Sequence, residues 1–306
     1  GRRLPLARAR RVVVVVRVAV VVRAQFPLGA AGTAAGCGID RRRRLPRLAS
    51  RTFSSELRRR GFSTEEGRRG TVALYIDTFT QYNEPSIGLA AMDVLEAAGY
   101  RVIPEMGLCC GRPMISKGFL EQAKGRAVRN VEHLSEFVDR GWPIIGLEPS
   151  CLSAFSDDYI DLVGGVAVKA VAANVHLLDD FLNGLIESGD LDIEFTGVER
   201  RILFHGHCHQ KALASTASTL AVLNAPPNYT ATELPSGCCG MAGSFGYEKE
   251  HFDVSMAIGR DRLFGPIDNS DPEVCIAATG TSCRHQIADA TSRDARHWVE
   301  FLREAL

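Results

Sequence analysis

Two loops of this chain carry a pair of adjacent cysteines followed by glycine. They read GLCCGRP at 107–113 and SGCCGMAG at 236–243. Adjacent cysteines rarely form a disulfide with each other, because that bond needs Cα atoms about 4.4–6.8 Å apart without strain. Two neighbouring thiols can, however, both reach one metal cluster. A pair that occurs twice therefore predicts a metal-binding chain built from two related halves.

The segments around each pair follow the same order of strand, helix, strand, cysteine loop, helix and strand. Short runs rich in β-branched residues predict strands at 71–77, 101–106, 143–151, 200–210, 228–234 and 273–283. Apolar residues at helical spacing predict helices at 84–100, 120–139, 172–187, 216–225, 248–264 and 293–305. Alternating strands and helices predict parallel sheets, so we expect an α/β fold of two tandem repeats, 71–197 and 198–306.

Four cysteines of the second repeat stand where its predicted strands end. Cys208 closes the first strand, Cys238 and Cys239 follow the second, and Cys283 closes the third. Because the carboxyl ends of parallel strands meet at one edge of a sheet, these thiols should meet there. Four thiolates hold either zinc or an iron–sulfur cluster. Zinc sites usually use C-x₂-C pairs, whereas a vicinal pair can span two irons, so we expect these four residues to bind a cluster.

The first repeat offers only three thiols, Cys109, Cys110 and Cys151. This second metal site is one ligand short. We expect one of three roles for these thiols. They would bind zinc, share the cluster of the other repeat, or form part of a substrate or quinone pocket. The remaining cysteines are expected to be incidental, Cys37 in the leader and Cys275 as a small buried hydrophobe.

Polar residues beside the cysteines are expected to support the bound group. In the predicted strand 200–210, His205, His207 and His209 would share one face and Cys208 the other. These histidines would donate hydrogen bonds, relay protons or replace a ligand; a polar strand end bound to loop backbone is the alternative. Gly240 would bring its N–H close to cluster sulfur. Three further neighbours are candidates for contacts with an anion or cluster: Arg112, Arg284 and His285.

Six blocks of residues, in order, resemble a known family. They read DTFTQYNEP, CCGRP, EPSC, FHGHCHQKAL, GCCGMAGSFGYE and GTSCRHQI. Together they resemble the cysteine-rich CCG domain of the heterodisulfide reductase B subunit and of glycolate oxidase iron–sulfur subunits. The likeness is strongest to the C-terminal part of FAD-linked, iron–sulfur D-lactate dehydrogenase-like proteins. The resemblance implies a [4Fe–4S] cluster that passes electrons from a flavin to an acceptor or a quinone pool.

The chain departs from the full pattern of that family, which has one Cys, a CC pair and then C-x-x-C. In the second repeat Gly280 stands where the extra Cys would be, and four ligands remain. In the first repeat Asp77 and Thr78 replace the leading Cys, and Glu148 stands where C-x-x-C would begin. Three thiols would then need help from Asp77, Glu148, a histidine or an outside group.

Residues 1–70 differ in composition from the rest, with 18 arginines, no lysine and four acidic residues. We expect a disordered, Arg-rich leader of the transit-peptide type. If this leader is genuine, the protein is expected in mitochondria; without it, a cytoplasmic location is expected. Wrongly translated upstream sequence and a nucleic-acid-binding arm are the alternatives. No aromatic residues are interleaved for base stacking, so no nucleic-acid partner is expected. The apolar run at 12–22 is too short for a membrane-spanning helix, which needs about 20 residues.

No dinucleotide fingerprint or other flavin-binding signature occurs in the chain. The chain begins with Gly and its first methionine is Met92, which is compatible with a fragment that lacks an upstream domain. The FAD domain would then be a partner subunit or a missing domain, with a quinone or a further iron–sulfur protein as the acceptor. A zinc-stapled interaction module without redox activity is the alternative function. Disulfide exchange by the CC pairs ranks below both, because poised redox pairs usually have C-x-x-C spacing.

Overall fold

The computed structural model describes residues 38–306, which build two four-stranded parallel sheets. The strand order is β2-β1-β3-β4 in the first sheet and β6-β5-β7-β8 in the second. The first sheet holds β1 (Thr71–Tyr75), β2 (Arg101–Glu105), β3 (Ile144–Gly146) and β4 (Val175–Leu177). The second holds β5 (Arg200–His205), β6 (Tyr229–Glu233), β7 (Cys275–Ala278) and β8 (Ala295–Arg296). The repeated order confirms the predicted α/β class with two tandem parallel-sheet units.

Helices connect the strands in both repeats. The helices before β5 are α3 (Phe53–Arg60), α4 (Thr78–Tyr82), α5 (Pro85–Ala97), α6 (Arg112–Ser116), α7 (Leu120–Asp139), α8 (Pro149–Ser153), α9 (Tyr159–Val163), α10 (Val166–Asn174) and α11 (Leu178–Glu187). Those after β5 are α12 (Cys208–Leu213), α13 (Ala217–Leu223), α14 (Phe252–Arg262), α15 (Phe264–Asp268), α16 (Thr281–Ala290) and α17 (Trp298–Glu304). Short helices therefore begin directly after β1, β3, β5 and β7, where longer strands were predicted.

Each sheet has a fourth strand that lies within a segment predicted to be helical. β4 interrupts the predicted helix 172–187, and β8 lies at the start of the predicted helix 293–305. β4 pairs with β3 and β8 pairs with β7, both in parallel. Strands of two or three residues are too short to show a period of two in the sequence. Their strand conformation therefore depends on tertiary pairing with β3 and β7.

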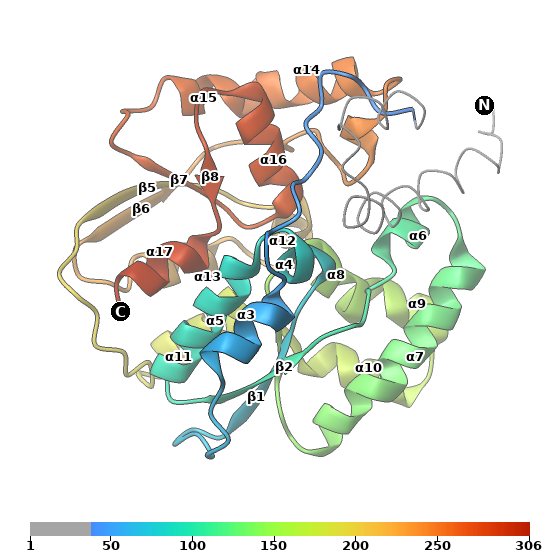
Figure 1. Cartoon of the computed structure of the whole chain (residues 1–306), viewed down its shortest axis with the longest axis vertical. Coiled ribbons are helices and arrows are strands. Elements are labelled where there is room, and N and C mark those ends of the chain that lie inside the picture. Colours follow the sequence, from blue (N-terminus) through green and yellow to red (C-terminus); the bar gives the residue numbers. More distant parts are fainter. Residues whose placement is uncertain (1–37) are drawn as a thin grey trace.

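One hydrophobic core joins the two repeats. Helices α5 and α17 pack together, as do α11 and α13, and Figure 1 shows these four helices between the two sheets. Their contact buries side chains from both repeats in one cluster, including Met92 and Val94 of α5 with Trp298 and Phe301 of α17. Because the repeats share this core, they form one body, and their cysteine-bearing edges hold fixed positions relative to each other.

Residues 38–70 belong to this body, contrary to the expectation of a leader that stays disordered up to residue 70. Phe53 and Leu57 of α3 are buried in the shared core. The buried Arg43 guanidinium donates hydrogen bonds to Gly246 O at 2.7 Å, Gln286 Oε1 at 2.6 Å and Ser255 Oγ at 2.8 Å. Composition misled the prediction here, because arginine can be buried when its donors are satisfied. Cys37 and the apolar run at 12–22 lie outside the described residues.

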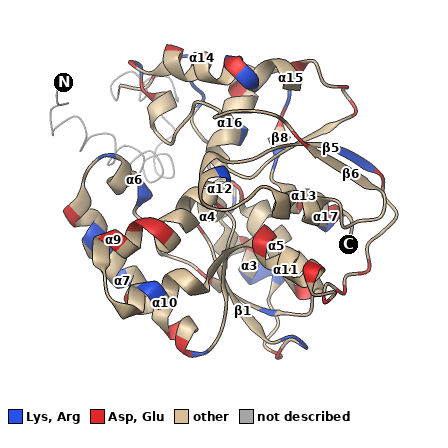
Figure 2. Cartoon of the chain, turned by 180° about the vertical axis from the view of Figure 1, so that it is seen from behind, with Lys and Arg blue, Asp and Glu red and all other residues tan. Residues whose placement is uncertain are grey.

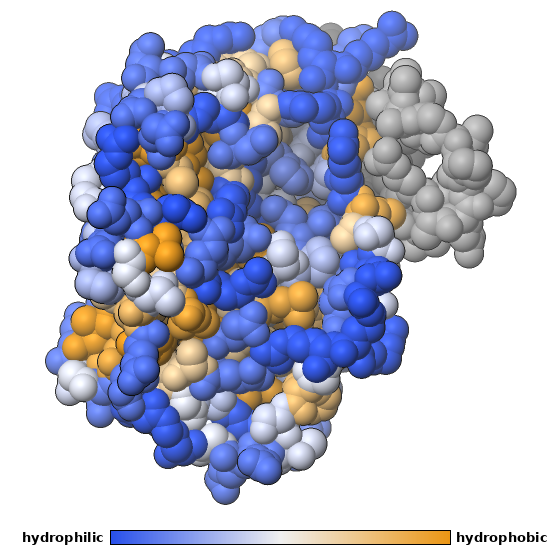
Figure 3. Space-filling view, turned by 60° about the vertical axis from the view of Figure 1, so that its left-hand side comes forward, coloured by the Kyte–Doolittle hydropathy of each residue, from blue (hydrophilic) through white to orange (hydrophobic). Residues whose placement is uncertain are grey.

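The outer surface is mixed in charge and polarity. Figure 2 shows acidic and basic residues distributed over the outer helices, and Figure 3 shows apolar residues in small groups among hydrophilic ones on one face. Within residues 38–306, no helix has the length and apolar character needed to cross a membrane.

Candidate functional site

The cysteines named from the sequence lie beyond the carboxyl ends of the strands, as predicted. Cys109 and Cys110 lie in the loop after β2, and Cys238 and Cys239 lie in the loop after β6. The single cysteines expected to bind a metal are not on strands, whereas Cys275 is the first residue of β7. Cys208 is the first residue of α12, while Cys151 and Cys283 each occupy the third position of the helix that follows a short strand.

The glycine of each CCG loop explains part of the motif. Gly111 and Gly240 have φ angles of +79° and +88°, a left-handed conformation that side chains disfavour. A Cβ atom on Gly240 would also lie 2.2 Å from the Ser255 carbonyl oxygen of α14. The Gly240 N–H donates a hydrogen bond to Cys238 Sγ at 3.3 Å. The glycine therefore lets the loop turn back onto its own cysteine pair.

A cavity of about 890 Å³ lies between the cysteine edges of the two repeats. The cysteines that line it come from both halves: Cys109, Cys208, Cys238, Cys239 and Cys283. His209 bridges the repeats beside it, with Nδ1 2.7 Å from Ser153 Oγ and Nε2 3.2 Å from Arg112 Nη2. Lys117 and Glu248 form a second link across the halves, an ion pair. The four cysteines of the second repeat thus share one rim, as the strand order predicted.

The thiols of the second repeat influence one another, and these interactions set their acidity. Hydrogen bonds from Cys208 and Cys239, together with the Gly240 N–H, lower the pKa of Cys238 to about 2. A hydrogen bond from Cys239, with His205 close by, lowers the pKa of Cys283 against the effect of burial. The pKa values of Cys208 and Cys239 are raised by the same pairing and by burial. The site therefore favours the thiolate, the form that binds metals, at Cys238 and Cys283, and the thiol at Cys208 and Cys239.

The three histidines near Cys208 do not share a face, so that prediction is wrong. The strand β5 ends at His205, His207 precedes α12 as its N-cap, and His209 lies inside that helix. His207 Nδ1 accepts the His209 N–H at 3.2 Å. Burial, followed by the charge of Arg112, lowers the pKa of His209 to about 4, so its ring is neutral. Because the chain turns into a helix at this point, the alternation of a strand no longer applies.

His205 tests whether these residues fit an iron–sulfur cluster. Its side chain is fully buried beside Cys283, and its Nδ1 lies 2.6 Å from Ser236 Oγ. Its Nε2 is buried without a hydrogen-bond partner among residues 38–306. A buried ring nitrogen without a partner is costly, and a sulfur-rich group at the thiols would supply an acceptor. Four thiols, this orphaned nitrogen and the Gly240 N–H that donates to Cys238 Sγ fit such a group.

A single ion fits less well. Across the described chain, no three His, Cys, Asp or Glu side chains are arranged to hold one metal ion. The four thiols of the second repeat instead line one cavity, which suits ligands that bind different metals of one cluster. Gly280, which stands at the position of a fifth cysteine, is crowded by His207. A Cβ atom there would lie 2.3 Å from His207 Cδ2. The His207 ring thus occupies the space that the side chain of a fifth cysteine would need.

The first repeat replaces the corresponding ligands with groups that are already engaged. Asp77 N-caps α4 and accepts hydrogen bonds from Phe79 N, Thr80 N and Thr80 Oγ1. Burial and the charge of Glu148 raise the pKa of Asp77 to about 6, although these hydrogen bonds lower it. Glu148 N-caps α8 through Ser150. Both carboxylates stabilise helix starts, and neither is free to complete a site with the three thiols of this repeat.

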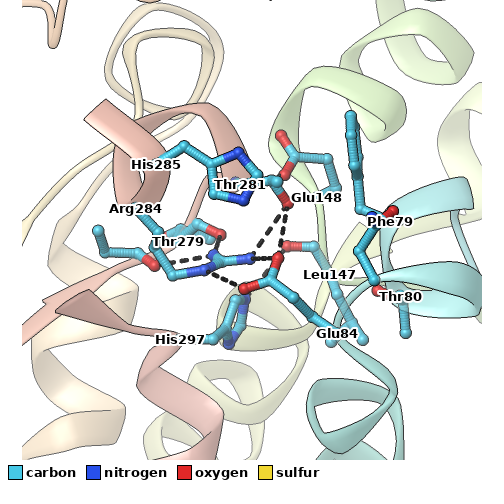
Figure 4. Close-up of polar contacts among 12 residues, drawn as sticks. Phe79, Thr80, Glu84, Leu147, Glu148, Thr279, Thr281, Arg284, His285 and His297 are labelled. Atoms are coloured by element: carbon cyan, nitrogen blue, oxygen red, sulfur yellow. Dashed lines mark hydrogen bonds and ion pairs between the residues drawn. The ribbon is translucent and has the colours of Figure 1, made fainter. Parts of the chain in front are cut away.

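Arg284 does not face the cavity as a donor to a bound group, contrary to the sequence prediction. Figure 4 shows its guanidinium between the carboxylate of Glu84 and the turn that leads into α16. Nη2 and Nε lie 2.6 and 3.1 Å from the two Glu84 oxygens, and Nη1 donates to Thr279 O at 2.6 Å. Glu84 belongs to the first repeat, so this ion pair joins the repeats next to Cys283, the residue before Arg284.

A second contact in Figure 4 involves the same start of α16. Glu148 Oε2 accepts the Thr281 N–H of α16 at 2.8 Å, while its Oε1 caps α8. One carboxylate thus connects the helix of Cys151 to the helix of Cys283. His285, another predicted contact residue, instead pairs with Tyr247 Oη at 2.8 Å. Sequence reasoning missed Glu84, because nothing local marks a partner 200 residues away.

Comparisons with known proteins agree with this arrangement. The family model of the cysteine-rich domain called CCG matches residues 77–156. The C subunit of anaerobic glycerol-3-phosphate dehydrogenase from Escherichia coli K12 is 31% identical over 271 residues, which cover 88% of this chain and 67% of the relative. D-2-hydroxyglutarate dehydrogenase from Pseudomonas putida is 28% identical, over 78% of this chain and 22% of the relative.

A third relative carries the cofactor in its name. The glycolate oxidase iron-sulfur subunit of Escherichia coli K12 is 26% identical, over 72% of this chain and 54% of the relative. The CCG loops, the strand order and these similarities are consistent with one another. The chain therefore belongs to the family of cysteine-rich CCG-domain proteins, which includes the C subunit of anaerobic glycerol-3-phosphate dehydrogenase.

Proposed function

We propose that this chain is the iron–sulfur part of a flavin-linked dehydrogenase for a 2-hydroxy acid, and that it carries electrons from the flavin to an acceptor or quinone. The observation that carries the proposal is the set of four thiols on one rim, facing a cavity between the repeats. Two of the three relatives described above are named for 2-hydroxy acids, D-2-hydroxyglutarate and glycolate. The flavin would lie on a partner subunit or a further domain.

In this proposal Cys208, Cys238, Cys239 and Cys283 hold a [4Fe–4S] cluster. When bound, such a cluster accepts and releases single electrons. The chain would supply the surroundings of that group. His205 Nε2 has no other partner among the described residues and would donate toward sulfur, and the Gly240 N–H already donates to Cys238 Sγ. Hydrogen bonds of this kind tune a reduction potential.

Metal and sulfide analysis of the full chain, purified without oxygen, tests the function. We expect about four irons and about four sulfides per chain, with an EPR signal that changes on addition of dithionite. The physical reason is the number of available thiols, which suffices for one cluster. Stoichiometric zinc without iron would contradict this proposal and support the alternative of a zinc-stapled interaction module.

We also propose that the protein is mitochondrial, on the basis of its arginine-rich, acid-poor N-terminal region. The fold limits where a processing protease could cut. Removal of residues up to the RRGFST segment would take away Arg43, Phe53 and Leu57, which are buried in the fold. We therefore expect the mature protein, isolated from mitochondria and sequenced from its N-terminus, to begin before Asp40. A mature chain that starts at 61–64 would contradict this expectation.

A further inference from the structure

The first repeat contains a pair of thiols that the proposed electron-transfer site does not use. Cys110 Sγ and Cys151 Sγ lie 3.2 Å apart, although the residues are 41 positions apart in the chain. Both side chains are buried, with 3% and 8% exposure, and both thiols are free. The vicinal pair itself is a poor disulfide, but Cys110 and Cys151 come from different elements and are not subject to that restraint.

A cluster of the kind proposed for the second repeat is short of a ligand here. Thr78 is the first residue of α4, directly after an N-cap, as Cys208 is the first residue of α12. A hydroxyl thus occupies the position of the fourth thiol. Asp77 and Glu148 are engaged as helix caps. Two thiols in contact, without the other ligands, are arranged for a sulfur–sulfur bond more than for a cluster.

The loop that carries Cys110 is held in place by side chains from three elements. Tyr75 Oη donates to Leu108 O at 3.0 Å, and Asn130 Nδ2 donates to Cys109 O at 3.0 Å. Tyr159 Oη donates to Cys110 O at 2.6 Å. Donors on β1, α7 and α9 therefore fix three successive carbonyls of this loop. This arrangement keeps the Cys110 thiol in contact with Cys151. Because the two sulfur atoms are already in contact, little rearrangement is needed to form a bond.

The third thiol gives this pair access to the cavity. Cys109 lines the cavity, whereas Cys110 and Cys151 lie behind it. Cys109 directly precedes Cys110 in the chain, and each affects the pKa of the other. A small molecule that reached Cys109 would thus be connected, through Cys110, to Cys151.

We propose that Cys110 and Cys151 form a reversible disulfide by exchange with a small disulfide, of the glutathione type, that enters the cavity at Cys109. The neighbouring Cys110 and burial raise the pKa of Cys109, so its thiolate is the minor form, and this form attacks the small disulfide and releases one thiol. Cys110 then attacks the outer sulfur of this mixed disulfide, which returns Cys109 to a thiol and moves the small group to Cys110. Cys151 attacks the Cys110 sulfur, forms the Cys110–Cys151 bond and releases the second thiol. In total, one small disulfide becomes two thiols, and two protein thiols become one disulfide.

The consequence is a two-electron site next to the one-electron site of the second repeat. The disulfide would tie the Cys110 loop to α8, and Glu148 already links α8 to α16, the helix of Cys283. The redox state of the first repeat would therefore stiffen one wall of the cavity that Cys283 lines.

Peptide mapping of the full chain without reduction tests the proposal. Protein purified without oxygen is incubated with oxidised glutathione or with dithiothreitol, alkylated and digested, and the peptides are measured by mass spectrometry. We expect a linked peptide joining Cys110 to Cys151 after oxidation, about 2 Da lighter than the two reduced peptides, and its loss in dithiothreitol. Absence of this link after oxidation, or a link that joins other cysteines, overturns the proposal.

Variants distinguish this site from the cluster site. Cys110→Ser and Cys151→Ser should each abolish the linked peptide and leave about four irons per chain. Cys275→Ser, a change on β7 away from the cavity, should keep both the linked peptide and the iron content. A fall from about eight to about four irons in Cys110→Ser would show that the first repeat binds a cluster and would overturn the proposal. The peptide map of the unaltered chain stays informative if the variants misfold or if the proposed cluster function is wrong.

Discussion

Replacement of Cys239 by serine should reduce the iron content from about four atoms per chain to fewer than about one. Cys239 is buried and interacts with Cys238 and Cys283, and its pairing with Cys283 favours the Cys283 thiolate. A serine hydroxyl at neutral pH is protonated and is a poor ligand for iron. Iron and sulfide analysis, together with absorbance near 400 nm, measures the loss.

Two further variants make this test specific. Cys238→Ser should cause the same loss, because the pKa of the Cys238 thiol is held far below its usual range. Cys275→Ser is the matched control, since Cys275 lies on β7, outside the cavity. Full iron in the Cys239→Ser protein, in a chain whose circular dichroism spectrum is unchanged, would assign the cluster to other residues.

Replacement of Arg284 by methionine should lower the free energy of unfolding by about 3 kcal/mol at neutral pH. The change leaves Glu84 partly buried without its partner and leaves the carbonyls of Ala278 and Thr279 without a donor. The Glu84 side chain is 26% exposed, so water offsets part of the cost. Urea unfolding, followed by circular dichroism, measures the difference.

The pH dependence gives this prediction a sign. Burial raises the pKa of Glu84, but Arg284 outweighs it and the pKa is lowered overall. A carboxyl with a depressed pKa stabilises the fold above its unfolded pKa, about 4.3, and this contribution is lost as the pH falls. The loss in free energy of unfolding that Arg284→Met causes should therefore become smaller toward acidic pH, because protonation of Glu84 removes the unpaired charge from the variant.

Control variants separate the ion pair from a general loss of charge. Glu84→Gln combined with Arg284→Met should recover part of the stability that Arg284→Met loses, since no buried charge then remains unpaired. Arg303→Met removes a more exposed arginine 3.9 Å from Asp93 and should change stability by less than about 1 kcal/mol. Equal losses in Arg284→Met and Arg303→Met would mean that the Glu84 pair does not hold the repeats together.

Period and spacing along the chain were enough to predict the class of fold and the edge of the sheet at which the thiols of the second repeat meet. The alternation of β-branched runs with amphipathic segments predicted parallel sheets, and the duplicated CCG loops predicted two related repeats. Because parallel strands end at a common edge, the sequence placed Cys208, Cys238, Cys239 and Cys283 on one rim. These inferences need no knowledge of distant contacts, because period and spacing are properties of the local sequence.

Packing between distant elements settled which residues face the site and which hold it. The chain leaves β5 at His205 and starts a helix at Cys208, so His207 and His209 line the cavity together with Cys208, and His205 does not. Arg284 turns away from the cavity to Glu84, and Cys110 contacts Cys151. These contacts join residues far apart in sequence, and burial of the shared core sets their geometry. No local sequence pattern predicts these contacts. Hydrophobic packing fixes the position of whole elements, and it does not specify the partner of any one side chain.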